Sequence, residues 1–140
     1  MKDATARRLS ALHRRLFRAT RGTIGKRLVH NDMLLLTTTG HRTARLHTVP
    51  LLYLMDVTNP IVIASWGGRP EHPTWYTNLV ADPAVHVQIR AHRFAAQAEP
   101  IPEPERTEWW ERAVTAYDGY ATYQSRTDRV IPVVRLARIE

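Results

Sequence analysis

The sequence predicts a mainly β protein of the α+β class, a small barrel of six strands with an N-terminal helix and two or three further short helices. Three observations predict it. Short apolar runs bounded by turn residues recur along the chain, the spacing between them is that of an antiparallel meander, and the helical patterns are short insertions. At 140 residues the chain is long enough for one domain with its own core.

Each expected strand has its own pattern. The first three are continuous apolar runs, and the third is followed by a tryptophan and two glycines. The fourth alternates apolar and polar residues, the fifth pairs back on it, and the last is again apolar. The expected strands are 33–36, 49–54, 61–64, 85–89, 94–98 and 131–136.

The expected helices have clear boundaries. Pro73 suits the first turn of a short helix that Asp82 and Pro83 end. A longer helix spans 105–116, and its expected apolar stripe is Trp110, Ala113, Val114 and Tyr117. After Gly119 a further turn or two covers residues 120–124.

The basic charge is concentrated in the first 30 residues, which carry nine Lys and Arg against one acid, whereas residues 31–140 carry eleven against twelve. Residues 4–20 form an amphipathic helical pattern. We therefore divide the chain into a basic N-terminal helix and linker, 1–30, and a domain, 31–140. Two interpretations stay open: the helix packs on the domain, or residues 7–18 touch an anionic membrane surface.

Composition excludes several classes of protein. There is no cysteine, so disulfides and thiolate chemistry are excluded. No apolar run is long enough for a membrane span, and no signal-peptide pattern is present, so we expect a cytoplasmic protein, with a peripheral place on the inner face of the cell membrane as the alternative. The domain lacks the basic face of a nucleic-acid-binding protein. The histidines lack metal-site spacing, so no metal is expected.

The loop between the first two strands carries His41, Arg42, Arg45 and His47 directly after Gly40. Cationic side chains on a loop held by two strands can bind an anion, and glycine lets backbone amides approach it. An ordinary hairpin with solvated arginines is an equally good interpretation. Farther along, Gly67 and Gly68 would allow the backbone to approach a flat ligand closely. Without an internal nucleophile or a metal, such a protein would use a bound cofactor.

Three tyrosines, Tyr117, Tyr120 and Tyr123, recur at intervals of three and would face neighbouring directions on a helix. Phenol rings can form the flat wall of a substrate pocket, with hydroxyl groups at its edge. Core packing is the alternative, and the spacing does not decide between the two.

The chain resembles the deazaflavin-dependent nitroreductase family of split β-barrel oxidoreductases. The matching motifs lie within residues 33–138: LLLTTTGHRT at 34–43, VPLLY at 49–53, IASWGGRPEHPTWYTNL at 63–79, DPAVHVQ at 82–88 and AYDGYATYQSRTDRVIPVV at 116–134. The resemblance implies a six-stranded split β-barrel that binds coenzyme F420, an 8-hydroxy-5-deazaflavin.

The resemblance also implies a set of site residues. The basic loop would hold the cofactor phosphate and anionic tail, the glycine turn would face the ring, and the tyrosines Tyr117, Tyr120 and Tyr123 would serve the substrate as catalytic residues. The implied cofactor residues are Gly40, His41, Arg42, Thr43, Arg45, His47, Pro50, Ala64, Ser65, Trp66, Gly67, Gly68, Trp75, Tyr76 and Asn78.

The resulting interpretation is an F420-dependent oxidoreductase, of nitroreductase or quinone reductase type, that transfers a hydride to a quinone, an enone or a nitroaromatic acceptor. Tyr120 or Tyr123 would hydrogen-bond the acceptor oxygen. The alternatives are a split barrel that binds FMN or haem, with FMN the second choice of cofactor, and a protein that carries deazaflavin without turnover. The partner is a small-molecule electron acceptor, and an oligomer is open.

Overall fold

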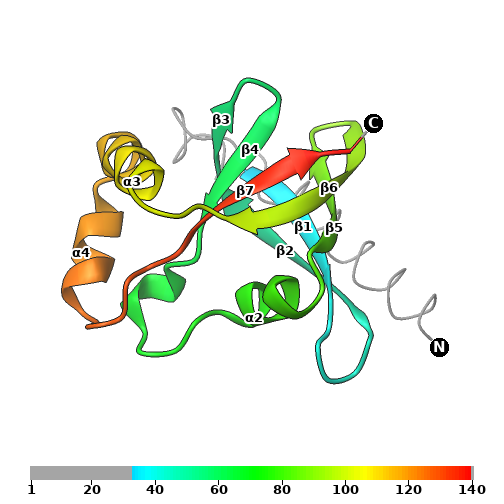
Figure 1. Ribbon diagram of the computed structural model, residues 1–140, viewed down its shortest axis with the longest axis horizontal. Helices are drawn as coiled ribbons and strands as arrows, with labels where there is room; N and C mark the ends of the chain where they lie inside the picture. The colour runs from blue at the N-terminus through cyan, green and yellow to red at the C-terminus, as the bar shows by residue number, and fades with distance from the viewer. Residues whose placement is uncertain (1–32, 140) are drawn as a thin grey trace.

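The computed structural model describes residues 33–139 and contains seven strands and four short helical segments (Figure 1). The expected helix at 4–20 and the segment 1–30 lie outside the described residues. The strands are β1 Met33–Thr39, β2 Leu46–Leu52, β3 Leu54–Asp56, β4 Asn59–Ile63, β5 Ala84–Ile89, β6 His92–Pro100 and β7 Val133–Arg138. The helical segments are η1 Trp66–Gly68, α2 Thr74–Ala81, α3 Glu105–Ala116 and α4 Gly119–Ser125.

All seven strands form one antiparallel sheet in the order β2-β1-β5-β6-β7-β4-β3. The two outer strands of this order, β2 and β3, are consecutive in the chain and are separated by Tyr53 alone. The two edges of the sheet therefore meet at one residue, and β2 comes close to β4. This geometry makes the sheet an open, split barrel, as expected.

The expected number of strands was wrong. The apolar run 49–54 looks like a single strand, but it divides at Tyr53 into the end of β2 and the start of β3. β2 pairs with β1, while β3 pairs with β4 through a two-residue turn at which Val57 adopts φ +59°. Pairing with two different partners at opposite edges of the sheet is a long-range property, so apolar periodicity does not reveal the break.

Two apolar clusters hold the fold together, and strands β4 and β7 contribute to both. Because successive strand residues point to opposite faces, Val62 and Val134 enter the main cluster, whereas Ile61, Ile63 and Val133 enter the second. The main cluster fills the barrel and includes Trp75 and Leu79 of α2, and the second includes residues of α3 and α4. A fully buried Leu, Ile or Val stabilises the fold by roughly 1.5–3 kcal/mol.

Helix α3 has the bounds that the sequence predicts, but its apolar stripe is turned. Trp109 and Ala113 are buried, and Trp110 is only half-buried, with the Arg106 guanidinium over its ring. The indole Nε1 of Trp109 also donates to Glu105 Oε2 at 3.3 Å. Trp109 can be buried because Glu105 accepts the hydrogen bond of its indole N–H. Helical periodicity gives no information about such a partner, so it does not predict which of the two tryptophans is buried.

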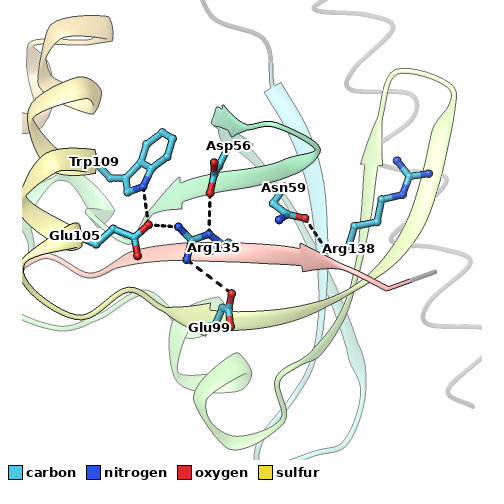
Figure 2. A network of polar contacts seen from close by, with 7 residues as sticks. All are labelled: Asp56, Asn59, Glu99, Glu105, Trp109, Arg135 and Arg138. Atoms are coloured by element: carbon cyan, nitrogen blue, oxygen red, sulfur yellow. Dashed lines mark hydrogen bonds and ion pairs between the residues drawn. The ribbon is translucent and has the colours of Figure 1, made fainter.

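A network around Arg135 joins α3 to the sheet (Figure 2). The Arg135 guanidinium, on β7, donates from Nε to Asp56 Oδ2 at 3.1 Å and is paired with Glu99 and Glu105. These acids come from β3, β6 and α3. The hydrogen bond from Arg135 is the main cause that lowers the pKa of Glu105. One side chain therefore cross-links four elements of the fold.

Candidate functional site

The basic loop is held by one buried amide. Asn78, on α2 and 1% exposed, accepts hydrogen bonds at Oδ1 from the backbone N–H of His41 at 3.1 Å and from His41 Nδ1 at 2.8 Å. Its Nδ2 donates to Thr38 Oγ1 at 3.1 Å. Asn78 was predicted as a cofactor residue. In the structure, its side-chain oxygen and nitrogen hydrogen-bond His41 and Thr38 and so position the loop relative to α2.

The side chains of the two loop arginines have no partner in the part of the chain that the structure describes. Arg42 and Arg45 are exposed, and neither guanidinium has a hydrogen bond or ion pair within residues 33–139. Thr43 Oγ1 accepts the backbone N–H of Arg45 at 3.2 Å, and Ala44 adopts φ +60°. The loop is thus internally ordered, and its two permanent charges remain available to an anion.

His47 lies on β2 opposite Thr38 instead of in the loop, as a correction to the sequence-based expectation. Its ring covers Gly40: a Cβ at Gly40 would lie 2.8 Å from His47 Nε2 and 2.8 Å from Thr43 Oγ1. A side chain at Gly40 would therefore displace the His47 ring and the Thr43 hydroxyl from their present positions. Pro50 also lies on β2, opposite Leu35.

The glycine turn follows β4 and contains Ala64, Ser65, Trp66, Gly67 and Gly68. Ala64 and Ser65 are buried, whereas Trp66 is 40% exposed with φ +43° and carries the Arg69 guanidinium 4.6 Å above its ring. Trp66 thus presents a flat aromatic surface to solvent from a strained backbone position.

The two glycines of this turn serve different purposes. Nothing lies within 4 Å of a Cβ placed on Gly67, so its surface is open to a ligand. A Cβ on Gly68 would lie 2.3 Å from the backbone oxygen of Tyr123. The close backbone approach expected at both glycines is therefore made at Gly68 by α4 of the protein itself.

Sequence reasoning did not identify Arg129, which holds the turn through hydrogen bonds to backbone carbonyl groups. Its guanidinium donates to the carbonyl oxygens of Ser65 at 2.7 Å, Arg69 at 2.9 Å and Ala64 at 3.2 Å. Nη1 also donates to His72 Nδ1 at 3.0 Å. Arg129 lies in the 116–134 motif of the resemblance, but no local periodicity marks an arginine whose partners are about 60 residues away.

Helix α2 contributes two aromatic residues to this end of the barrel. Trp75 is 7% exposed and packs in the main cluster. Tyr76 is half-buried, and its ring centroid lies 4.7 Å from that of His72. Burial raises the pKa of Tyr76. Of the two, Tyr76 is the residue that adjoins the turn and its arginine.

The tyrosines do gather, although not on one helix. Tyr117 caps α3, while Tyr120 and Tyr123 belong to α4. The hydroxyls of Tyr117 and Tyr123 are 3.1 Å apart, and Tyr120 is 8% exposed in the second apolar cluster. The hydrogen bond to Tyr123 and then burial raise the pKa of Tyr117, and burial raises the pKa of Tyr120. Both phenols therefore remain protonated donors at neutral pH.

The elements that carry the predicted site residues follow one another along one end of the barrel, except that Pro50 lies within β2 opposite Leu35. Figure 1 shows α2 between the β1–β2 loop and η1, and α4 packs on η1. This order joins free cations, a half-buried tyrosine, an open glycine and a pair of phenols. A hollow of about 220 Å³ on another face, lined mainly by β1, β2, β5 and β6, contains none of these residues.

Two classes of feature are missing from residues 33–139. No helix there is long and apolar enough to cross a membrane. No group of three or more His, Cys, Asp or Glu side chains in the same part of the chain is placed to hold a metal ion.

Comparison with known proteins gives a consistent result. A model of the F420H(2)-dependent quinone reductase family matches residues 9–137. The F420H(2)-dependent quinone reductase of Mycobacterium tuberculosis (strain H37Rv) is 39% identical over 134 residues, which cover 93% of this chain and 90% of that protein.

Two solved structures have 40% sequence identity to this chain. An F420-H2 dependent reductase, FDR-A, has a TM-score of 0.69 and aligns over 75% of this chain and 93% of its own. A structure described as a domain-swapped dimer has a TM-score of 0.70 and aligns over 75% of this chain and 79% of its own.

Proposed function

The chain belongs to the F420H(2)-dependent quinone reductase family and is an oxidoreductase whose cofactor is coenzyme F420; from that premise we propose which residues hold the cofactor and which meet the acceptor. The cofactor, when bound in its reduced form, supplies the hydride. The protein supplies position, exclusion of water and hydrogen-bond donors.

The described residues fit a long anionic cofactor with a flat ring. Within residues 33–139, Arg42 and Arg45 offer two unpaired guanidinium groups to its phosphate and acidic tail, and Thr43 offers a hydroxyl. Gly67 offers an open backbone surface to the ring. The two arginines on one ordered loop are the observation that carries this assignment, because two permanent positive charges close together attract an anionic phosphate and tail.

The turn and the phenols would form the other end of the site. Trp66 presents its exposed ring next to Gly67. Tyr123 lies on α4, the helix that packs against this turn, and its hydroxyl is paired with that of Tyr117 at the end of α3. We assign to Tyr123 the donation of a hydrogen bond to the acceptor oxygen. Tyr117 orients that hydroxyl, and Tyr120 supports both rings from the second apolar cluster.

The acceptor is a quinone, with enones and nitroaromatics as further acceptors of the same hydride. Each of these has an electrophilic centre conjugated to an oxygen that gains negative charge as the hydride arrives. A protonated phenol beside that oxygen would stabilise this charge.

The experiment is a titration of the purified protein with F420 and with FMN, followed by turnover with menadione. We expect F420 to bind more tightly, because its longer anionic tail reaches both Arg42 and Arg45. We also expect reduced F420 to be oxidised only when protein and menadione are both present. FMN binding of equal or greater affinity would contradict the assignment of the basic loop.

Two finer proposals concern association. A structural relative is described as a domain-swapped dimer, so light scattering of this protein should be measured for a dimer. Residues 7–18 remain a proposed contact with anionic membranes, and cosedimentation of the full chain with anionic vesicles at low salt tests it. Recovery of all the protein in the supernatant would remove the membrane proposal.

A further inference from the structure

The guanidinium of Arg129 donates from all three of its nitrogens, and its hydrogen bonds go to one segment, residues 64–72. Four hydrogen bonds join it to the carbonyls of Ala64, Ser65 and Arg69 and to the ring of His72. Two of these acceptors, Ala64 and Ser65, belong to the glycine turn, and the other two, Arg69 and His72, follow it directly. Arg129 lies in the connection between α4 and β7, outside any helix or strand, so its hydrogen bonds fix that connection against the glycine turn.

This turn needs such support. Three consecutive residues, Trp66, Gly67 and Gly68, have positive φ, and Trp66 carries the steric cost of that conformation with a side chain. A strained backbone persists only when surrounding contacts over-determine it. The turn's own hydrogen bonds are few: Gly68 N–H donates to Ser65 at 2.9 Å and Arg69 N–H donates to Trp66 at 3.2 Å.

Arg129 also joins the two halves of the site. It follows α4, the helix of Tyr120 and Tyr123, by four residues. Arg126, in the same connection, donates to the carbonyl of Gly67 at 3.3 Å and lies over the ring of Tyr123. The segment 126–129, which follows the tyrosines, therefore hydrogen-bonds the carbonyl oxygens of Ala64, Ser65 and Gly67 in the glycine turn.

We propose that Arg129 is a positioning residue for hydride transfer, which sets the glycine turn in the conformation that receives the deazaflavin ring and sets its distance from the tyrosines. This inference rests on the proposed function. Arg129 touches neither cofactor nor acceptor in this scheme, because its four hydrogen bonds all go to protein acceptors. Its substitution should therefore change ring binding and turnover without changing the charge presented to the cofactor tail.

The test compares Arg129→Lys and Arg129→Ala with Arg135→Ala. The lysine keeps the charge, but one ammonium group cannot reach four acceptors arranged around a planar fork. Arg135→Ala is the matched control, since it removes an arginine with three acidic partners elsewhere and lowers stability without touching the turn. The melting temperature of each variant is measured first. The F420 dissociation constant, and kcat and KM with menadione, are then measured at a temperature well below every melting temperature.

We expect both Arg129 variants to bind F420 about tenfold more weakly and to lose a similar factor in kcat, with a smaller change in the menadione KM. Millimolar guanidinium should restore part of the F420 affinity of Arg129→Ala, and sodium chloride at equal ionic strength should not. If Arg129→Ala fails to fold, Arg129→Lys gives the answer.

Wild-type affinity and kcat in the folded Arg129 variants would overturn the inference, as would an equal loss in Arg135→Ala. Failure of the unmodified protein to bind F420 would instead refute the proposed function, and the inference with it. The two failures are thus distinguished by the unmodified protein alone.

Discussion

The basic loop and the glycine turn are both irregular connections at one end of the barrel, yet they are stabilised in opposite ways. A neutral buried amide, Asn78, holds the loop, and the guanidinium groups of Arg42 and Arg45 have no partner within residues 33–139. A charged side chain, Arg129, holds the turn through four hydrogen bonds to neutral protein acceptors. In the proposed site, the unpaired charges would meet the anionic tail of the cofactor, and the hydrogen-bonded charge would support the turn that receives its flat ring.

The largest expected effect separates the two glycines of the turn. Gly68→Ala should lower the free energy of unfolding by about 2–4 kcal/mol, because its Cβ would lie 2.3 Å from the Tyr123 carbonyl oxygen at φ +80°. Gly67→Ala meets no neighbouring atom and should cost only about 1 kcal/mol for its positive φ. Urea unfolding of both variants measures the difference, and equal losses would show that α4 does not press on the turn.

The next effect tests the free charges of the loop. Arg42→Ala should weaken F420 binding by about 1–3 kcal/mol, the range for a charge-assisted hydrogen bond. The free energy of unfolding should change by less than about 0.5 kcal/mol, because the side chain is exposed and unpaired within the described structure.

Salt dependence gives a second measure of the same charge, since the affinity of Arg42→Ala should fall less steeply with ionic strength than that of the parent protein. Arg93→Ala is the control, because Arg93 is an exposed arginine on β6 outside the proposed site. Parental affinity of Arg42→Ala at every salt concentration would remove Arg42 from the site.

The phenols should have a smaller effect, confined to the reaction. Tyr123→Phe removes the hydroxyl paired with Tyr117 and should slow single-turnover hydride transfer about tenfold, which corresponds to about 1.4 kcal/mol. Its F420 affinity should be nearly unchanged. Tyr120→Phe is the matched comparison, because Tyr120 lies in the apolar cluster and its hydroxyl has no hydrogen bond among the described residues. A slower rate for Tyr120→Phe alone would reverse the assignment.

The smallest expected effect is a pH dependence at His72. Burial, and then the charge of Arg129, lower the pKa of His72 below 6.5. The unfolded chain therefore binds this proton more readily, so the stability that neutral His72 contributes is complete above about pH 6.5 and is lost as pH falls through the lowered pKa.

Denaturant unfolding at several pH values checks this sign with His72→Gln, which should lose less stability on acidification than the parent. The side chains around His72 are Arg129, Tyr76 and the neighbouring Glu71, whose charge also acts on Arg129. A parent and variant with parallel pH profiles would show that His72 does not exchange its proton in this range.

Local patterns predicted most elements because their causes are local. Apolar alternation and turn residues located the strands, and the bounds of α3 follow from its own residues. The split at Tyr53, the choice of Trp109 over Trp110 and the role of Arg129 each depend on partners far along the chain. The same limit applies to Gly68, whose neighbour is the backbone of α4 and not a ligand.

The proposed site can be compared with the sequence in the same way. Residue types and their order marked the basic loop, the glycine turn and the tyrosines, and the resemblance gave them roles. The patterns did not show which residues of each group are buried and which are exposed. Asn78 and Trp75 are buried supports, whereas Arg42, Arg45 and Gly67 are open to a ligand.

The position of β7 has a consequence for synthesis of the protein on the ribosome. β7 is the last strand of the chain, yet it lies between β6 and β4 near the middle of the sheet. Until residues 133–138 leave the exit tunnel, β4 and β6 have no partner for these edges, and the two ends of the sheet cannot close at Tyr53. A chain synthesised only as far as β6 therefore has uncovered strand edges on β4 and β6, and we expect it to be aggregation-prone until residues 133–138 are added.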